Sequence, residues 1–147
     1  MATMQATNNA SVYRGPSLAA RISYVAAIIV NVILWVIAHQ LLEWGIPFVT
    51  ADWPDVLWAV RLSLGASIVA NALYLFYDAR WFRRLGDIVT GSAALMSLVV
   101  MFVIFPFALP INLMQQCFRL GLLALAICQG IAILVHTVRL LSLGDEA

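Results

Sequence analysis

Four long apolar stretches dominate the chain, and short connections with polar or turn-forming residues separate them. They cover residues 22–42, 56–77, 88–107 and 117–138. An α-helix of roughly 20 apolar residues crosses a hydrocarbon core about 30 Å thick, and each stretch is near that length. None of them shows the alternation of apolar and polar residues that a strand of a membrane β-barrel needs. The pattern therefore predicts an all-α integral membrane protein with four transmembrane helices.

The short connections between neighbouring spans predict how the helices pack. Consecutive helices that are joined by short loops lie antiparallel, so the expected fold is a four-helix antiparallel bundle that forms one domain over residues 17–147. Residues 1–16 are rich in Thr, Asn, Ala and Ser, a composition typical of a disordered tail. The first span is longer than the apolar core of a signal peptide, which favours a membrane anchor that is retained.

Composition excludes several classes of protein. The chain is 64% hydrophobic and only 10% charged, whereas soluble domains average roughly 45–50% and about 25%. These values exclude a soluble globular enzyme. The net charge of +1 provides no overall field that would attract nucleic acid. The lipid bilayer is thus the first expected partner.

The placement of arginine predicts the orientation of the spans. All eight cationic residues are arginine. Six of them fall on one side of a four-span arrangement: Arg14, Arg21, Arg80, Arg83, Arg84 and Arg139. Because arginine accumulates on the cytoplasmic side, we expect both termini to be cytoplasmic. The absence of lysine, together with the bias towards Ala and Leu, indicates a bacterial source and hence the inner membrane.

The connection at 78–87 mixes arginine with aromatic residues. Arg80, Arg83 and Arg84 lie there beside Trp81 and Phe82. Basic residues next to a span are attracted to anionic lipid headgroups, and aromatic rings prefer the same level of the membrane. We therefore expect this connection to be a short turn in the headgroup layer, in contact with anionic lipid.

Polar residues inside a span are candidates for function because they are unfavourable in lipid. One lies near the middle of each predicted helix: Asn31, Asn71, Ser97 and Gln129. The functional interpretation is a polar layer that holds water or passes a small solute. The structural alternative is hydrogen bonding between helices, which contributes roughly 0.6–2 kcal/mol per side chain. Stripes of small residues at four-residue spacing, such as Ala59, Ser63 and Ser67, favour close helix packing in either case.

A second polar group lies near the predicted outer ends of the spans. Its members are His39, Glu43, Arg61 and Arg119. His39 and Glu43 are four residues apart and therefore share a helix face. The functional interpretation is a binding or proton site, in which the arginines bind an anion and the histidine changes its charge near neutral pH. The structural alternative is an ion pair between Glu43 and Arg61 that fixes the helix ends.

The sequence contains no catalytic motif and no metal-binding set, and it indicates no cofactor. Cys117 and Cys128 fall on one predicted helix, roughly 16 Å apart in depth, which is too far for a disulfide. We expect a non-catalytic membrane protein that acts as an accessory or scaffold subunit or that self-associates. The alternative is a small homo-oligomeric channel or transporter for a proton or a small anion, built from the midplane layer and the outer arginines. An enzyme acting on lipid or quinone is a third hypothesis.

Overall fold

The computed structural model describes residues 16–142, and this part of the chain is all α apart from one isolated β-bridge. Its four helices are α1 (Leu18–Gln40), α2 (Trp53–Phe76), α3 (Arg80–Ile104) and α4 (Asn112–Leu141). Each is long and apolar enough to cross a membrane. The prediction of an all-α chain with four helices of membrane-spanning length is thus confirmed. The predicted disordered tail at 1–16 lies outside the described residues except for its last position.

Local sequence explains where the helices begin and end. The Ser17 hydroxyl accepts a hydrogen bond from the backbone N–H of Ala20 at 3.2 Å, as the side chain of an N-cap residue does. Pro54 lies in the first turn of α2, where its missing N–H has no helical partner to lose. Phe105 ends α3 in the left-handed region with a φ of 47°, and Pro106 behind it cannot continue the helix.

Helix α3 begins at Arg80 rather than at residue 88, where the predicted span begins. Most of the connection expected at 78–87 is therefore helical. Arginine and aspartate lower the hydropathy of this segment without preventing a helix, because they recur at positions 80, 83, 84 and 87. This spacing places all four on one helix face. The other positions, which include Phe82 and Leu85, form an apolar face. Together with residues of α2, this face lines an apolar pocket.

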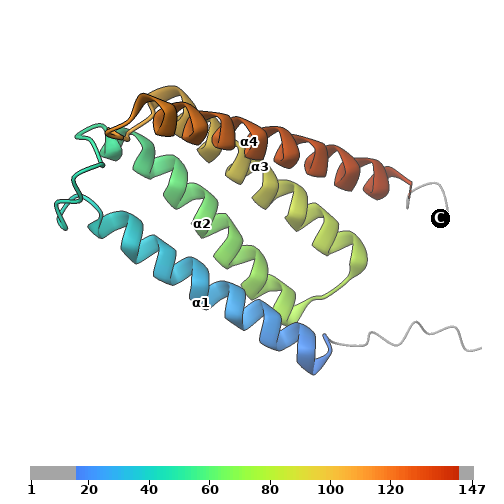
Figure 1. Ribbon diagram of the computed structural model, residues 1–147. Coiled ribbons are helices and arrows are strands. Elements are labelled where there is room, and N and C mark those ends of the chain that lie inside the picture. The colour runs from blue at the N-terminus through green and yellow to red at the C-terminus, as the bar shows by residue number, and fades with distance from the viewer. Residues whose placement is uncertain (1–15, 143–147) are drawn as a thin grey trace, which may run out of the picture.

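The four helices lie side by side in the order of the chain, with α1 and α4 at the two edges (Figure 1). Among the described helices, Cα atoms within 8 Å of each other join only α1 to α2, α2 to α3 and α3 to α4. A closed four-helix bundle would also bring the first helix against the last. The described residues thus form an open row of helices.

The connections α1–α2 and α3–α4 meet at one end of this row (Figure 1). Val49 forms a β-bridge with Phe107. Two backbone hydrogen bonds flank the bridge, from Thr50 N–H to the Pro106 carbonyl at 3.0 Å and from Ala108 N–H to the Phe48 carbonyl at 2.9 Å. The largest fully buried side chains of the described residues, Val56 and Pro106, lie at this end. The two loops therefore join the α1–α2 pair to the α3–α4 pair at this end of the row.

Candidate functional site

Two adjoining cavities lie between the helices on the side away from the paired loops, and each has a volume of about 440 Å³. The first is lined by α2, α3 and α4: Ser67, Asp87, Thr90, Gly91, Ala94, Gln129, Ala132, Ile133 and His136. The second involves all four helices: Ser23, Tyr24, Asn71, Tyr74, Arg80, Arg83, Arg84, Asp87, His136 and Arg139. Both include Asp87 and His136, so the cavities are adjacent. We call the two together the polar groove.

An aspartate and a histidine lie at the junction of the two cavities. The His136 Nδ1 atom on α4 is 3.7 Å from the Asp87 Oδ2 atom on α3, so that the two form an ion pair when the histidine is protonated. The hydroxyl of Tyr74, on α2, donates to the Arg83 carbonyl at 3.0 Å and lies 3.5 Å from the Asp87 Oδ1 atom. Three helices thus meet at this point through polar side chains.

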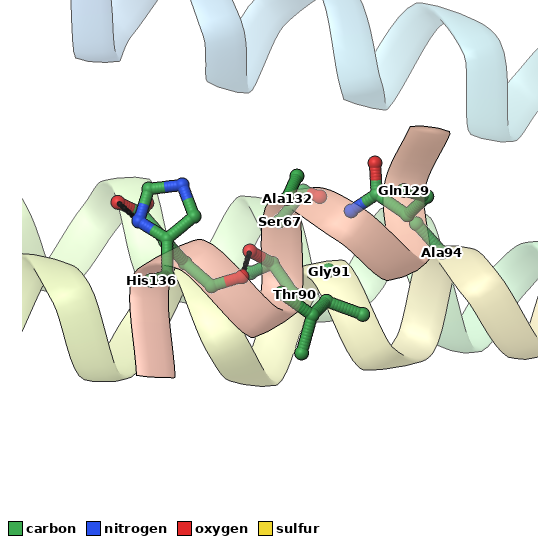
Figure 2. A pocket seen from close by; sticks show the side chains of 9 residues that line it. Ser67, Thr90, Gly91, Ala94, Gln129, Ala132 and His136 are labelled. Carbon is green, nitrogen blue, oxygen red and sulfur yellow. Dashed lines mark hydrogen bonds and ion pairs between the residues drawn. The ribbon is translucent and has the colours of Figure 1, made fainter. Parts of the chain in front are cut away.

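Gln129 lies at the end of the groove nearer the middle of the helices. Gly91 on α3 is buried, and a Cβ atom at this position would be 2.8 Å from the Gln129 Nε2 atom. The absence of a side chain at Gly91 therefore makes room for the glutamine amide against the backbone of α3. Figure 2 shows that Gln129 and His136 point towards the side on which the blue ribbon of α1 passes. The amide and the imidazole consequently face the same space.

The opposite end of the groove is held by a network around Arg83. This arginine forms an ion pair with Asp78 at 3.1 Å and donates to the Tyr24 hydroxyl at 3.3 Å. The Tyr24 hydroxyl in turn donates to the Asp78 carboxylate at 2.9 Å. The Asp78 side chain is only 12% exposed, and bonds to both partners compensate for the burial of its charge. The network connects the start of α1 to the start of α3.

Of the predicted outer cluster, the structure brings two members together. A guanidinium nitrogen of Arg61 on α2 is hydrogen-bonded to the His39 Nδ1 atom on α1. Arg119 instead lies over the Phe105 ring, 4.5 Å from its centroid, and Glu43 forms no ion pair within residues 16–142. Since α1 packs against α2 and not against α4, Arg119 is not a neighbour of His39.

The members of the predicted midplane layer do not bond to one another in the described part of the chain. Asn31 and Asn71 each donate to a carbonyl of their own helix, to Ala27 and Ser67 respectively, at 2.7 Å. Ser97 is buried on α3. Gln129 lines one cavity of the groove and Asn71 the other. The amides are therefore distributed along the groove and the helices rather than gathered in one layer.

Several groove residues were not identified as site candidates from the sequence. Asp87 and His136 lie near the ends of predicted spans, where charged and polar residues are common. Tyr74 and Arg139 are equally ordinary for an interfacial position. One sequence feature could have identified some of them. The charges from Arg80 to Asp87 have helical spacing, so they share one face if the helix predicted from residue 88 begins earlier. The predicted headgroup residues Arg80, Arg83 and Arg84 all line the groove.

Residues 16–142 contain no group of three or more His, Cys, Asp or Glu side chains that could hold a metal ion. Cys117 and Cys128 are exposed free thiols on α4. The chain matches no family model, and comparison with curated proteins and with solved structures gave no match. Inferences about function therefore depend on the chemistry of the groove.

Proposed function

We propose that the protein is a non-catalytic membrane subunit that assembles with a second copy of itself through the polar groove. The observation that carries this proposal is the open row of helices, in which α1 does not approach α4 and the groove is left uncovered. In this proposal the helices complete a bundle only in the assembled protein. The arginine-rich end faces the cytoplasm, as do both termini, in accordance with the positive-inside rule.

The depth of the groove favours a covering partner. Ser67 and Gln129 lie roughly 13–18 Å from the nearest end of their helices, at about 1.5 Å per residue. At that depth water does not compete for hydrogen bonds, and each unsatisfied polar group costs several kcal/mol. Contact with lipid chains would therefore be unfavourable for this part of the groove. Contact with another protein surface that offers polar groups relieves the penalty.

The chemistry of the groove fits a second copy. Amide and hydroxyl groups both donate and accept hydrogen bonds, so a surface that carries them can pair with itself about a two-fold axis. Such an axis, normal to the membrane, places Gln129 of each copy at the same depth. The small residues Gly91, Ala94 and Ala132 line the same cavity and allow the helices of two copies to approach closely.

Disulfide cross-linking in native membranes tests this proposal. In a chain with Cys117→Ala and Cys128→Ala, we introduce Ala132→Cys in the groove and, separately, Leu134→Cys. Leu134 is 64% exposed on the same helix and does not line the groove, so it is the matched control. We expect oxidation to produce a covalent dimer of the Ala132→Cys chain and little of the Leu134→Cys chain. Equal cross-linking of both, or a monomeric mass by native mass spectrometry, contradicts the proposal. Co-purification of a different subunit on the groove would replace self-association by an accessory role.

One observation favours a channel or transporter as a second candidate. Polar side chains continue from Gln129 through Asp87 and His136 to the arginines, along two cavities that share residues. Such a path suits a proton or a small anion. If it conducts, we expect flux into liposomes to fall at least about tenfold in the Gln129→Leu chain, because the path has lost an amide that can form hydrogen bonds with the solute. Flux that does not change in Gln129→Leu or His136→Phe chains excludes this path.

A further inference from the structure

At the end of the groove near the α2–α3 connection, the described arginines outnumber the described carboxylates that could neutralise them. Four arginines line the second cavity: Arg80, Arg83, Arg84 and Arg139. Arg83 forms an ion pair with Asp78, and Arg84 donates to the Arg139 carbonyl at the end of α4. The guanidinium groups of Arg80 and Arg139 have no hydrogen bond or ion pair within residues 16–142. Two cations that have no partner among the described residues therefore line one cavity.

The remaining carboxylate of this cavity does not neutralise them. Asp87 lies 3.7 Å from His136 and 3.5 Å from the Tyr74 hydroxyl, and of the described residues it is the only acidic one that lines the cavity. Like charges at the edge of the hydrocarbon repel one another more strongly than they would in water. An anion between Arg80 and Arg139 would remove this repulsion.

We propose that a phosphate-bearing anion binds in this cavity between Arg80 and Arg139, as the phosphate of an anionic phospholipid or as free phosphate. The guanidinium fork matches two phosphate oxygens at once. Further donors line the same cavity: the Ser23 hydroxyl and the Asn71 amide, which has one N–H committed to the Ser67 carbonyl and a second one available. The volume of about 440 Å³ accommodates a phosphate together with part of a headgroup.

Neighbouring aromatic rings place this cavity at the level where phosphates lie in a bilayer. Tyr77 and Trp81 pack at 6.1 Å between ring centroids beside the α2–α3 connection, and such rings prefer the headgroup level of a membrane. The Tyr24 hydroxyl lines the cavity at the same end. The site requires only the described chain, so it does not depend on the proposed self-association.

Calorimetric titration of the full-length protein in an uncharged detergent tests the proposal. The probes are dihexanoyl phosphatidylglycerol, inorganic phosphate, and dihexanoylglycerol, which has the same acyl chains without phosphate. We expect the phospholipid to bind, inorganic phosphate to compete with it, and dihexanoylglycerol to bind far more weakly. Phosphate that binds as tightly as the phospholipid supports the site and identifies a free anion as its ligand. Binding of dihexanoylglycerol as tight as that of the phospholipid, or no binding of either phosphate probe, overturns the proposal.

Substitutions at the two arginines provide the second part of the test. We expect Arg80→Gln and Arg139→Gln each to weaken phospholipid binding at least about tenfold, the effect of losing a hydrogen bond to a charged group. Arg21→Gln is the matched control, because Arg21 lies at the same end, donates to the Pro16 carbonyl and does not line the cavity. Arg80→Lys and Arg139→Lys keep the positive charge but lack the forked guanidinium group, so we expect a smaller loss of phospholipid affinity. These lysine variants also provide the test if a glutamine variant fails to fold. Affinities in all four variants equal to that of the Arg21→Gln chain overturn the proposal.

Discussion

Gly86 and Tyr74 show how closely α2 and α3 approach beside the groove. Tyr74 is buried, with 6% of its surface exposed, and its ring packs edge-on against Phe82 at 6.0 Å between centroids. A Cβ atom at position 86 would lie 2.7 Å from the Tyr74 Cζ atom, closer than any ordinary contact. The tyrosine cannot turn away without losing its hydrogen bond to the Arg83 carbonyl. Glycine at this position is thus what allows Tyr74 to reach α3.

We expect Gly86→Ala to lower the free energy of unfolding by about 1–2 kcal/mol. Overpacking costs roughly 1–3 kcal/mol. Because the added Cβ atom would overlap the Tyr74 ring, the upper part of this range applies, and it exceeds the helix-propensity gain of about 1 kcal/mol for replacing glycine by alanine. Gly121→Ala on α4 is the control, because a Cβ atom there would meet nothing within 4 Å, so the propensity gain should raise stability. Denaturant titration in detergent micelles measures both. A stabilised Gly86→Ala chain would show that the two helices do not approach this closely.

At the scale of the element, the number and type of the helices could be predicted from apolar stretches alone. The start of α3 could not, because a hydropathy search ends where the arginines begin, whereas a helix continues wherever its charged positions share one face. The candidate outer cluster could be predicted only in part, because its members were chosen by their depth along the helices. Contact between His39 and Arg61 joins consecutive helices, and their similar predicted depth was a sufficient guide. Arg119 has a similar depth but lies on a helix that does not touch α1, and depth contains no information about which helices are neighbours.

At the scale of the whole molecule, one aromatic cluster joins the two helix pairs at the loop end. The Phe107 ring lies 6.1 Å from that of Trp53 at the start of α2 and 5.0 Å from that of Phe118 on α4. Trp53 itself donates from its indole N–H to the Ala38 carbonyl of α1 at 2.8 Å. Contacts of this cluster therefore extend from α1 to α4, although those two helices do not touch.

We expect Phe107→Ala to destabilise the protein by roughly 2 kcal/mol, since it removes ring contacts from a partly buried site. Phe102→Ala is the size-matched control, because Phe102 is 37% exposed on α3 and is absent from the aromatic contacts of the described chain. We expect a smaller loss than for Phe107→Ala, because Phe102 makes none of the ring contacts that Phe107 makes. Thermal unfolding in micelles compares the two chains. Equal losses would show that the loop end does not hold the helix pairs together.

Each described helix packs only against the helices next to it in the chain, and this has a consequence for folding during synthesis. A nascent chain emerges from its N-terminus, so each described helix finds its only preceding partner already synthesised when it leaves the ribosome. Contacts at short sequence separation form quickly, and the α1–α2 pair does not wait for later segments. Longer-range contacts form later: the hydrogen bond from Arg83 to Tyr24 needs the start of α3, and the bridge between Val49 and Phe107 can close only after α3 has been inserted. The order of synthesis is therefore also the order in which the helices can pack, and this pairing of loops is a late contact between the first half of the chain and the second.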